Sequence, residues 1–377
     1  MYRREDKMRG KSFRKVAVLM LIVFTLGVLA GCGGREKVQQ EALPETRTVT
    51  NLDGSEIVVP VEVKKVAALF GPSYEKVVLL GAEDKIVANG DFHIDGWPWS
   101  NCIYKRLNEV PGVPNAHTSL NIEEILKLSP DVVFYWDNPQ EVKRLQEANI
   151  AVVPAVSAPG GQKLEDCKNM LMVYAQVLGK DEEKVATEYA KYFDEKVRMI
   201  SAVTANIPEN ERPKVYFAMQ KLLWTAGKAS DMPELIKLAG GNCVHQDLIG
   251  GGKNEINMEQ LLKWNPDFIF VDHAGSSGNA SAEEVVGAIS DDQRFKQLTA
   301  VQKEQVRVCP TGVFFWDAGQ QKILLLMWIA KTIHPNKFKD LDMQTELKDF
   351  YKKFFRYNLS DDQAQRILMH LPPNDKP

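Results

Sequence analysis

The chain has 377 residues, with 47 basic and 50 acidic side chains and a formal net charge of −3. Residues 1–31 hold seven of the bases and two of the acids, so the remainder has a formal charge of −8. This acidic balance argues against a nucleic-acid partner, which requires a basic face. The remaining length of about 345 residues is enough for two domains of ordinary size.

The N-terminal residues have the parts of a secretory signal. A basic opening precedes an apolar run at 16–29, and Leu29-Ala30-Gly31-Cys32 follows. Fourteen apolar residues are short for a membrane span, which needs about 20, and the pattern is typical of a signal peptide. The alternative is an uncleaved transmembrane anchor. The last four residues resemble a bacterial lipobox, which implies cleavage before Cys32 and diacylglycerol on its thiol. We therefore predict a signal peptide at 1–31, a flexible tether at 32–47 and lipid anchoring on the extracytoplasmic face of the cell membrane.

Short apolar runs alternate with helical patterns through the rest of the chain. Residues 48–50 and 57–59 flank Asp53-Gly54, which predicts a β-hairpin. Further apolar runs predict strands at 66–69, 86–88, 132–135, 152–153, 215–219, 268–271 and 306–309. Strands separated by helical stretches indicate βαβ units and mainly parallel sheets, so the predicted fold class is α/β.

One segment occurs twice in the chain. Residues 121–134 read NIEEILKLSPDVVF, and residues 257–270 read NMEQLLKWNPDFIF. Each copy predicts a short helix, a Pro-Asp break and a buried strand. Two copies 136 residues apart indicate two lobes of the same build.

Between the copies, residues 181–206 carry apolar side chains at helical spacing. We predict one long helix that joins an N-terminal lobe (48–180) to a C-terminal lobe with terminal helices (207–377). The alternative is an ordinary surface helix of the first lobe. A stiff connector would permit only small movements of the lobes.

The predicted signal peptide, the two lobes and the linking helix together resemble the substrate-binding lipoproteins of ABC importers. The likeness is to the class III periplasmic binding proteins, which have a helical backbone and take up iron–siderophore, haem or cobalamin. It covers most of residues 48–371, and it rests on both repeats, on GPSYE and VVLLGA at 71–75 and 77–82, and on TAGK and MPELIKLAGG at 225–228 and 232–241. It implies two α/β lobes joined by one rigid helix, and a monomer that delivers a metal chelate to an ABC permease without a cofactor of its own.

The resemblance also implies that one glutamate on each lobe contacts arginines of the permease. Glu75 and Glu234 occupy matching positions, each opening a predicted helix. A carboxylate in a first helical turn is favoured by the helix dipole, and an exposed one can steer docking to a basic surface. The alternative is that both acids only stabilise their own helix ends.

Loops that follow predicted strands are the expected place for a ligand, because ligands of open parallel sheets bind beyond the carboxyl ends of the strands. Aromatic side chains there supply broad apolar area with a polar tip, which suits large metal complexes. A tryptophan in the core or between the lobes is the alternative at each position. The candidate ligand-binding residues are Ser73, Trp97, Tyr104, Arg106, Trp136, Trp224, His273 and Trp316.

Two other cargoes or functions remain open. An oxyanion such as molybdate or tungstate would be favoured if Lys105, Arg106 and Lys221 converged on a small pocket. A surface hydrolase or adhesion protein could use the same scaffold. The sequence contains no G-x-S-x-G or H-E-x-x-H motif, so we predict no catalytic residues and no enzyme.

The histidines and cysteines do not predict a resident metal site. The six histidines include no i, i+4 pair, although loop-borne His273 could ligate a haem iron. Four cysteines follow Cys32 without any C-x-x-C spacing, which argues against structural zinc. An exported location permits disulfides, and free thiols are the alternative for Cys102, Cys167, Cys243 and Cys309.

Overall fold

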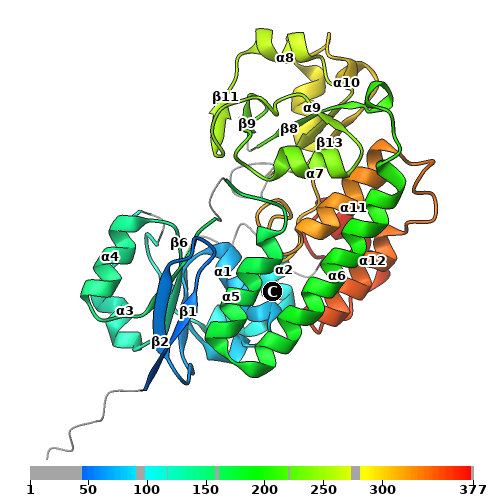
Figure 1. Ribbon diagram of the computed structural model, residues 1–377. Helices are drawn as coiled ribbons and strands as arrows, with labels where there is room; N and C mark the ends of the chain where they lie inside the picture. Colours follow the sequence, from blue (N-terminus) through cyan, green and yellow to red (C-terminus); the bar gives the residue numbers. More distant parts are fainter. Residues whose placement is uncertain are drawn as a thin grey trace, which may run out of the picture. The chain divides into compact units, whose positions relative to one another are not determined.

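A computed structural model describes residues 45–90, 98–116, 118–157, 161–219, 221–272 and 281–374 (Figure 1). The predicted signal peptide, Cys32, Trp97 and His273 lie outside these described residues. Within the described ranges, no helix combines the length and apolar character that a membrane span requires.

The N-terminal lobe is built on a parallel sheet with the strand order β5-β4-β3-β6-β7, preceded by the antiparallel hairpin β1-β2. The strands are β1 (Thr46–Thr50), β2 (Glu56–Pro60), β3 (Val66–Ala68), β4 (Ile86–Gly90), β5 (Gly112–Val113), β6 (Val132–Trp136) and β7 (Val152–Ala155). The helices are α1 (Gly71–Leu79), η1 (Glu83–Lys85), α2 (Pro98–Ile103), η2 (Lys105–Glu109), α3 (Ile122–Leu128), α4 (Pro139–Glu147) and α5 (Asp166–Leu178). Helices α3 and α4 cover one face of the sheet, and α1 and α5 cover the other (Figure 1).

The C-terminal lobe contains a second parallel sheet, with the strand order β10-β8-β12-β13, and an antiparallel pair β11-β9. Its strands are β8 (Lys214–Ala218), β9 (Trp224–Ala226), β10 (Asn242–Cys243), β11 (Lys253–Glu255), β12 (Phe268–Val271) and β13 (Val306–Val308). Its helices are η3 (Glu209–Glu211), α7 (Met232–Leu238), α8 (Met258–Trp264), α9 (Ala282–Asp291), α10 (Thr299–Gln302), α11 (Lys322–Ile333), α12 (Met343–Phe354) and α13 (Asp361–Leu368). The predicted hairpin and all seven predicted strands are present, which confirms a two-lobe α/β fold with mainly parallel sheets.

The repeated segment forms the same helix in both lobes. Asn121 and Asn257 are the N-caps of α3 and α8, and each side chain accepts a backbone N–H three residues later. Both helices end on a residue with left-handed backbone conformation, Ser129 (φ 46°) and Asn265 (φ 44°). A short polar side chain tolerates this conformation better than an apolar one, so the repeat sets both ends of its helix.

The aspartate of each Pro-Asp break ties the repeat to a neighbouring strand. Asp131 Oδ2 accepts the backbone N–H groups of Lys64 (2.7 Å) and Lys65 (2.8 Å), just before β3. Asp267 Oδ2 accepts the backbone N–H of Lys214 at the start of β8 (2.9 Å). Both strands run parallel to the strand that follows the aspartate. The repeat therefore fixes where the first core strand of each lobe begins.

One long helix, α6 (Lys180–Thr204), connects the lobes, close to the predicted range of 181–206. It contacts α5 of the N-terminal lobe as well as α7 and α11. Its buried side chains recur at helical spacing, among them Tyr189, Phe193 and Ile200. The helix is therefore a packed connector rather than a surface helix of the first lobe.

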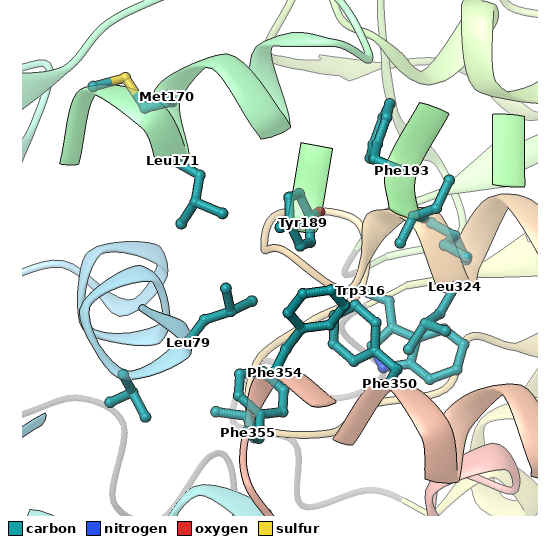
Figure 2. Packing of buried hydrophobic residues seen from close by; sticks show 14 of the residues in the cluster. Leu79, Met170, Leu171, Tyr189, Phe193, Trp316, Leu324, Phe350, Phe354 and Phe355 are labelled. Carbon is teal, nitrogen blue, oxygen red and sulfur yellow. The ribbon is translucent and has the colours of Figure 1, made fainter. Parts of the chain in front are cut away.

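The C-terminal segment is a second connection between the lobes. Val313 O accepts the Tyr74 hydroxyl (2.7 Å), and Leu371 O accepts the indole N–H of Trp99 (2.9 Å). Figure 2 shows the core where Leu79 of α1, Tyr189 of α6, Trp316 and the phenylalanines of α12 lie together. The predicted C-terminal lobe, residues 207–377, therefore includes a segment between 313 and 371 that also contacts the N-terminal lobe.

Candidate ligand-binding site

A cavity of about 400 Å³ lies between the two lobes. Phe70, Ser157 and Met219 line it, and they follow β3, β7 and β8 respectively. The cavity therefore lies beyond the carboxyl ends of strands from both sheets, where open parallel sheets bind their ligands. Its volume is within the usual range of small-molecule sites, roughly 300–1,000 Å³.

Lys76 is the cationic side chain that α1 brings to this cavity. It is only 6% exposed, and its Nζ donates to Pro72 O (3.1 Å) and lies 5.5 Å from the centre of the Tyr174 ring. Among the described residues, no carboxylate forms an ion pair with it. Burial lowers the pKa of Lys76 below its usual value, because the charged form loses solvation.

Lys322, at the start of α11, is a second cationic side chain of the cavity wall, but its charge is compensated. Its ammonium forms a buried ion pair with the Asp231 carboxylate, and both residues line the cavity. Burial lowers the pKa of Lys322, but Asp231, Cys167 and Asp317 together outweigh burial, and the pKa lies above its usual value. The two lysines thus differ: Lys322 forms an ion pair with a carboxylate, whereas Lys76 forms none among the described residues, although the nearby Glu75 charge raises its pKa.

Cys167 of α5 also lines the cavity, and its thiol is neutral at physiological pH. Its Sγ lies 3.3 Å from the Tyr189 hydroxyl and 3.5 Å from Gly319 O. Burial raises the pKa of Cys167 to about 11. All four cysteines that follow Cys32 are free thiols. Within the described residues, no group of three His, Cys, Asp or Glu side chains could hold a metal ion.

Three predicted ligand-binding residues lie in the core instead of the cavity wall. Ser73 is fully buried and shares a hydrogen bond with the Tyr174 hydroxyl (2.8 Å). Trp316 is fully buried and donates to Gln321 Oε1 (3.1 Å). Tyr104 is buried, with its ring 6.1 Å from that of Phe355. The prediction that these residues face the ligand is wrong for this cavity, because the C-terminal segment and α5 pack over them.

Three further candidates lie nearer the surface, and they are also absent from the cavity wall. Arg106 forms an ion pair with Asp84 (2.6 Å) on the exposed side of η2. Trp136 ends β6 and is half-buried. The Trp224 ring lies beneath the ammonium groups of Lys221 (4.1 Å) and Lys253 (3.8 Å). Arg106 and Lys221 therefore do not line the pocket, and the side chain of Lys105 lies outside the described ones.

The two matched glutamates lie in different environments. Glu75 is in the second turn of α1 and 0% exposed, and it accepts Gln320 N–H (2.7 Å) and Gln321 Nε2–H (3.0 Å). Burial raises the pKa of Glu75 to about 7. Glu234 is exposed in the first turn of α7 and accepts Leu164 N–H (2.9 Å). The expectation of an exposed carboxylate is wrong for Glu75, because residues 319–321 cover it.

Sequence reasoning missed the charged side chains that do line the cavity, which are Lys76, Asp166, Asp231, Asp317 and Lys322. Lys76 directly follows Glu75 inside a segment that the resemblance had already selected. Lys322 directly precedes the apolar run at 323–330, and a charged residue at the start of a largely buried helix is a usable signal. Asp231 precedes a Met-Pro pair and gives no such signal.

The comparisons with known proteins agree with this geometry. A family model described as periplasmic binding protein matches residues 66–312. The molybdate-binding protein MolA of Haemophilus influenzae is 29% identical over 274 residues, covering 67% of this chain and 75% of MolA. The solved structure of MolA bound to molybdate has a TM-score of 0.70 at 21% identity, covering 83% of this chain and 99% of that one.

Two other solved structures share the fold. A periplasmic solute binding protein from Veillonella parvula has a TM-score of 0.69 at 26% identity, covering 86% of this chain and 97% of its own. CeuE from Helicobacter pylori, in a Ni-His complex, has a TM-score of 0.70 at 20% identity, covering 86% and 99%. The family consists of solute-binding proteins that act outside the cytoplasm, and the matched region includes both sheets and the linking helix. The chain therefore belongs to the periplasmic binding protein family, as the solute-binding component of an ABC importer and not as an enzyme.

Proposed function

We propose that this protein captures a small oxyanion of the molybdate type in the interlobe cavity and delivers it to its permease. The observation that carries this proposal is Lys76, a buried ammonium in the cavity wall that has no carboxylate partner among the described residues. A lysine ammonium has three donors, and Lys76 uses one of them on Pro72 O. An anion in the cavity would accept from the others and compensate the buried charge.

One relative, and the positions of the aromatic residues predicted to bind the ligand, support an anion over a large chelate. MolA, the relative at 29% identity, is named for molybdate. The aromatic residues that favoured a large metal complex do not line the cavity: Tyr104 and Trp316 are in the core, and Trp136 and Trp224 lie elsewhere.

A metal chelate, the cargo implied by the resemblance to siderophore, haem and cobalamin binders, is the second candidate. Two observations favour it: the cavity has room for far more than a five-atom anion, and much of its lining is apolar. That lining includes Phe70, Phe217 and the methionines Met170, Met219 and Met232. The two cargoes predict different roles for Lys76, which makes the choice testable.

Calorimetric titration of the chain from residue 33 onward distinguishes the candidates. Molybdate, tungstate and sulfate form one set of ligands, and a ferric siderophore, haem and cobalamin form the other. We expect molybdate to bind and Lys76→Met to weaken it about tenfold or more, the value of a hydrogen bond to a charged group. Lys85→Met is the matched control, because Lys85 pairs with Glu182 (2.8 Å) away from the cavity. Binding of a chelate that is insensitive to Lys76→Met would reject the anion proposal.

Membrane attachment and docking complete the proposed function. We propose that Cys32 carries the lipid and that Glu234 contacts an arginine of the permease, with the protein acting as a monomer. Cys32→Ser should move the protein from the membrane fraction to the soluble fraction. Glu234→Arg should abolish uptake while leaving ligand affinity unchanged; a loss of affinity would remove the docking assignment.

A further inference from the structure

We propose that Glu75 is a positioning residue: its carboxylate holds residues 311–321, here called the interlobe strap, and so fixes Lys322 opposite Lys76. The strap connects β13 to α11 and contains the buried Trp316. The effect on cargo rests on the proposed function, whereas the effect on the strap itself does not.

The strap lies directly against α1. Val313 O accepts the Tyr74 hydroxyl (2.7 Å). At Gly71 an added Cβ would come within 2.3 Å of the Phe314 ring, and at Gly319 it would come within 2.1 Å of Glu75 Oε2. Only glycine permits so close an approach at these two positions. Both ends of the strap are therefore pressed against the N-terminal lobe.

The side-chain amide of Gln321 has a fixed orientation and donates a hydrogen bond to the Glu75 carboxylate. Gln321 Oε1 accepts from Trp316 Nε1 (3.1 Å) and from the Tyr351 hydroxyl (2.5 Å). Because two donors occupy the oxygen, Gln321 Nε2 points to Glu75 Oε1 (3.0 Å). The other carboxylate oxygen accepts Gln320 N–H (2.7 Å). Glu75 thus meets two donors, and a side chain without two acceptor sites cannot replace it fully.

The contact of Glu75 with Gln320 and Gln321, here called the latch, is adjacent in sequence to two residues of the cavity wall. Lys76 follows Glu75 in α1, and Lys322 follows Gln321 at the start of α11. Both lysines line the cavity, as do Gly319 and Gln320 of the strap. A shift of the strap relative to α1 therefore changes the separation of the two ammonium groups that face the cargo.

Amide hydrogen exchange at Gln320 tests the latch without any ligand. We expect exchange about tenfold or more faster in Glu75→Ala, because Gln320 N–H loses a charged acceptor. Glu75→Gln should fall between Ala and wild type, since its amide oxygen can still accept one bond. Gly319→Ala should also accelerate exchange while keeping the carboxylate. Glu234→Ala is the matched control on the other lobe and should leave Gln320 unchanged.

An internal control separates a local effect from general destabilisation. The Gln260 N–H of α8 is also held by a side-chain oxygen, Asn257 Oδ1 (2.8 Å), far from the strap in sequence. Its exchange should be the same in all variants. Unchanged exchange at Gln320 in Glu75→Ala and Glu75→Gln would overturn the proposal, and so would equal acceleration at Gln260.

Molybdate titration of the same variants tests the consequence for cargo. Coupling between the latch and the site predicts a loss of at least about fivefold in affinity for Glu75→Gln. A purely electrostatic effect has the opposite sign, because removing a negative charge beside Lys76 would strengthen anion binding; stronger binding would therefore overturn the positioning role. If wild type does not bind molybdate, the proposed function fails, and the exchange data still decide whether Glu75 holds the strap.

Discussion

The helices that open the two lobes carry a glutamate at corresponding positions, yet one carboxylate is buried and the other is exposed. Glu75 lies beneath the interlobe strap, and Glu234 faces solvent beside Leu164. By contrast, the repeated units α3–β6 and α8–β12 share an asparagine N-cap, a last residue with left-handed backbone conformation, and an aspartate that accepts backbone N–H at the start of a neighbouring strand.

This comparison shows that a local sequence can determine the caps and turns of a helix, but not the burial of its side chains. Caps and turns depend on residues within a few positions of one another, so two similar segments form them alike. Exposure depends on what distant residues pack against a surface. Residues 311–321 cover α1, and Glu75 is therefore buried although it corresponds in sequence to the exposed Glu234.

Charge reversal of the two glutamates should give the largest difference between the lobes. Glu75→Arg places a guanidinium in a buried site beside Lys76, and we expect the free energy of unfolding to fall by about 4 kcal/mol. Glu234→Arg loses only the bond to Leu164 N–H and should cost about 1 kcal/mol. Urea unfolding of both variants measures the difference, and equal costs would contradict the different burial of the two sites.

The pH dependence of stability should show a contribution from the buried Glu75. Burial raises the pKa of Glu75 from 4.5 to about 7, while Lys76, Gln320 and Gln321 oppose this shift. Between these values the folded state binds more protons than the unfolded state, so this group lowers the free energy of unfolding as pH rises from about 4.5 to 7. The total change is roughly 3 kcal/mol.

The comparison of wild type with Glu75→Gln isolates this effect. His245, whose pKa burial lowers to about 4, contributes a slope of opposite sign between pH 4 and 6.5 in both proteins. The difference in unfolding free energy between them should therefore change with pH only through Glu75. A difference that stays constant from pH 4.5 to 7 would show that Glu75 titrates normally.

The aspartates of the repeat should give the smallest difference. Asp131 accepts two backbone N–H groups and Asp267 accepts one. We expect Asp131→Ala to cost about 2 kcal/mol and Asp267→Ala about 1 kcal/mol in thermal or urea unfolding. The Asn variant of each keeps an acceptor oxygen and should recover part of the loss. A larger cost at Asp267 would break the proposed correspondence between hydrogen-bond number and stability.

The fold was predictable because its signals are local or repeated. The strands at 66–68 and 268–271 stand out as apolar runs, and α6 stands out by the periodicity that includes Tyr189 and Phe193. The strands β5, β9, β10 and β11 were not predicted, because their short sequences, GV, WTA, NC and KNE, contain no apolar run.

The site was less predictable because its residues meet only through tertiary packing. Lys76 lies in α1, Asp231 caps α7 and Lys322 begins α11, and these positions are about 90 residues or more apart along the chain. Trp316 follows a strand, as a ligand-binding loop residue would, but the Gln321 amide and the core hold it. The expectation that ligands bind at loops after strands correctly predicts the edge of the sheet where the cavity lies. It does not predict which side chains line the cavity.

A crystal structure of the protein grown with molybdate tests the central claim most directly, because the anomalous signal of molybdenum locates the anion. We predict one peak in the interlobe cavity, within hydrogen-bonding distance of Lys76 Nζ and on the side that faces Lys322. An empty cavity at saturating molybdate, or an anion bound elsewhere on the surface, would contradict the account.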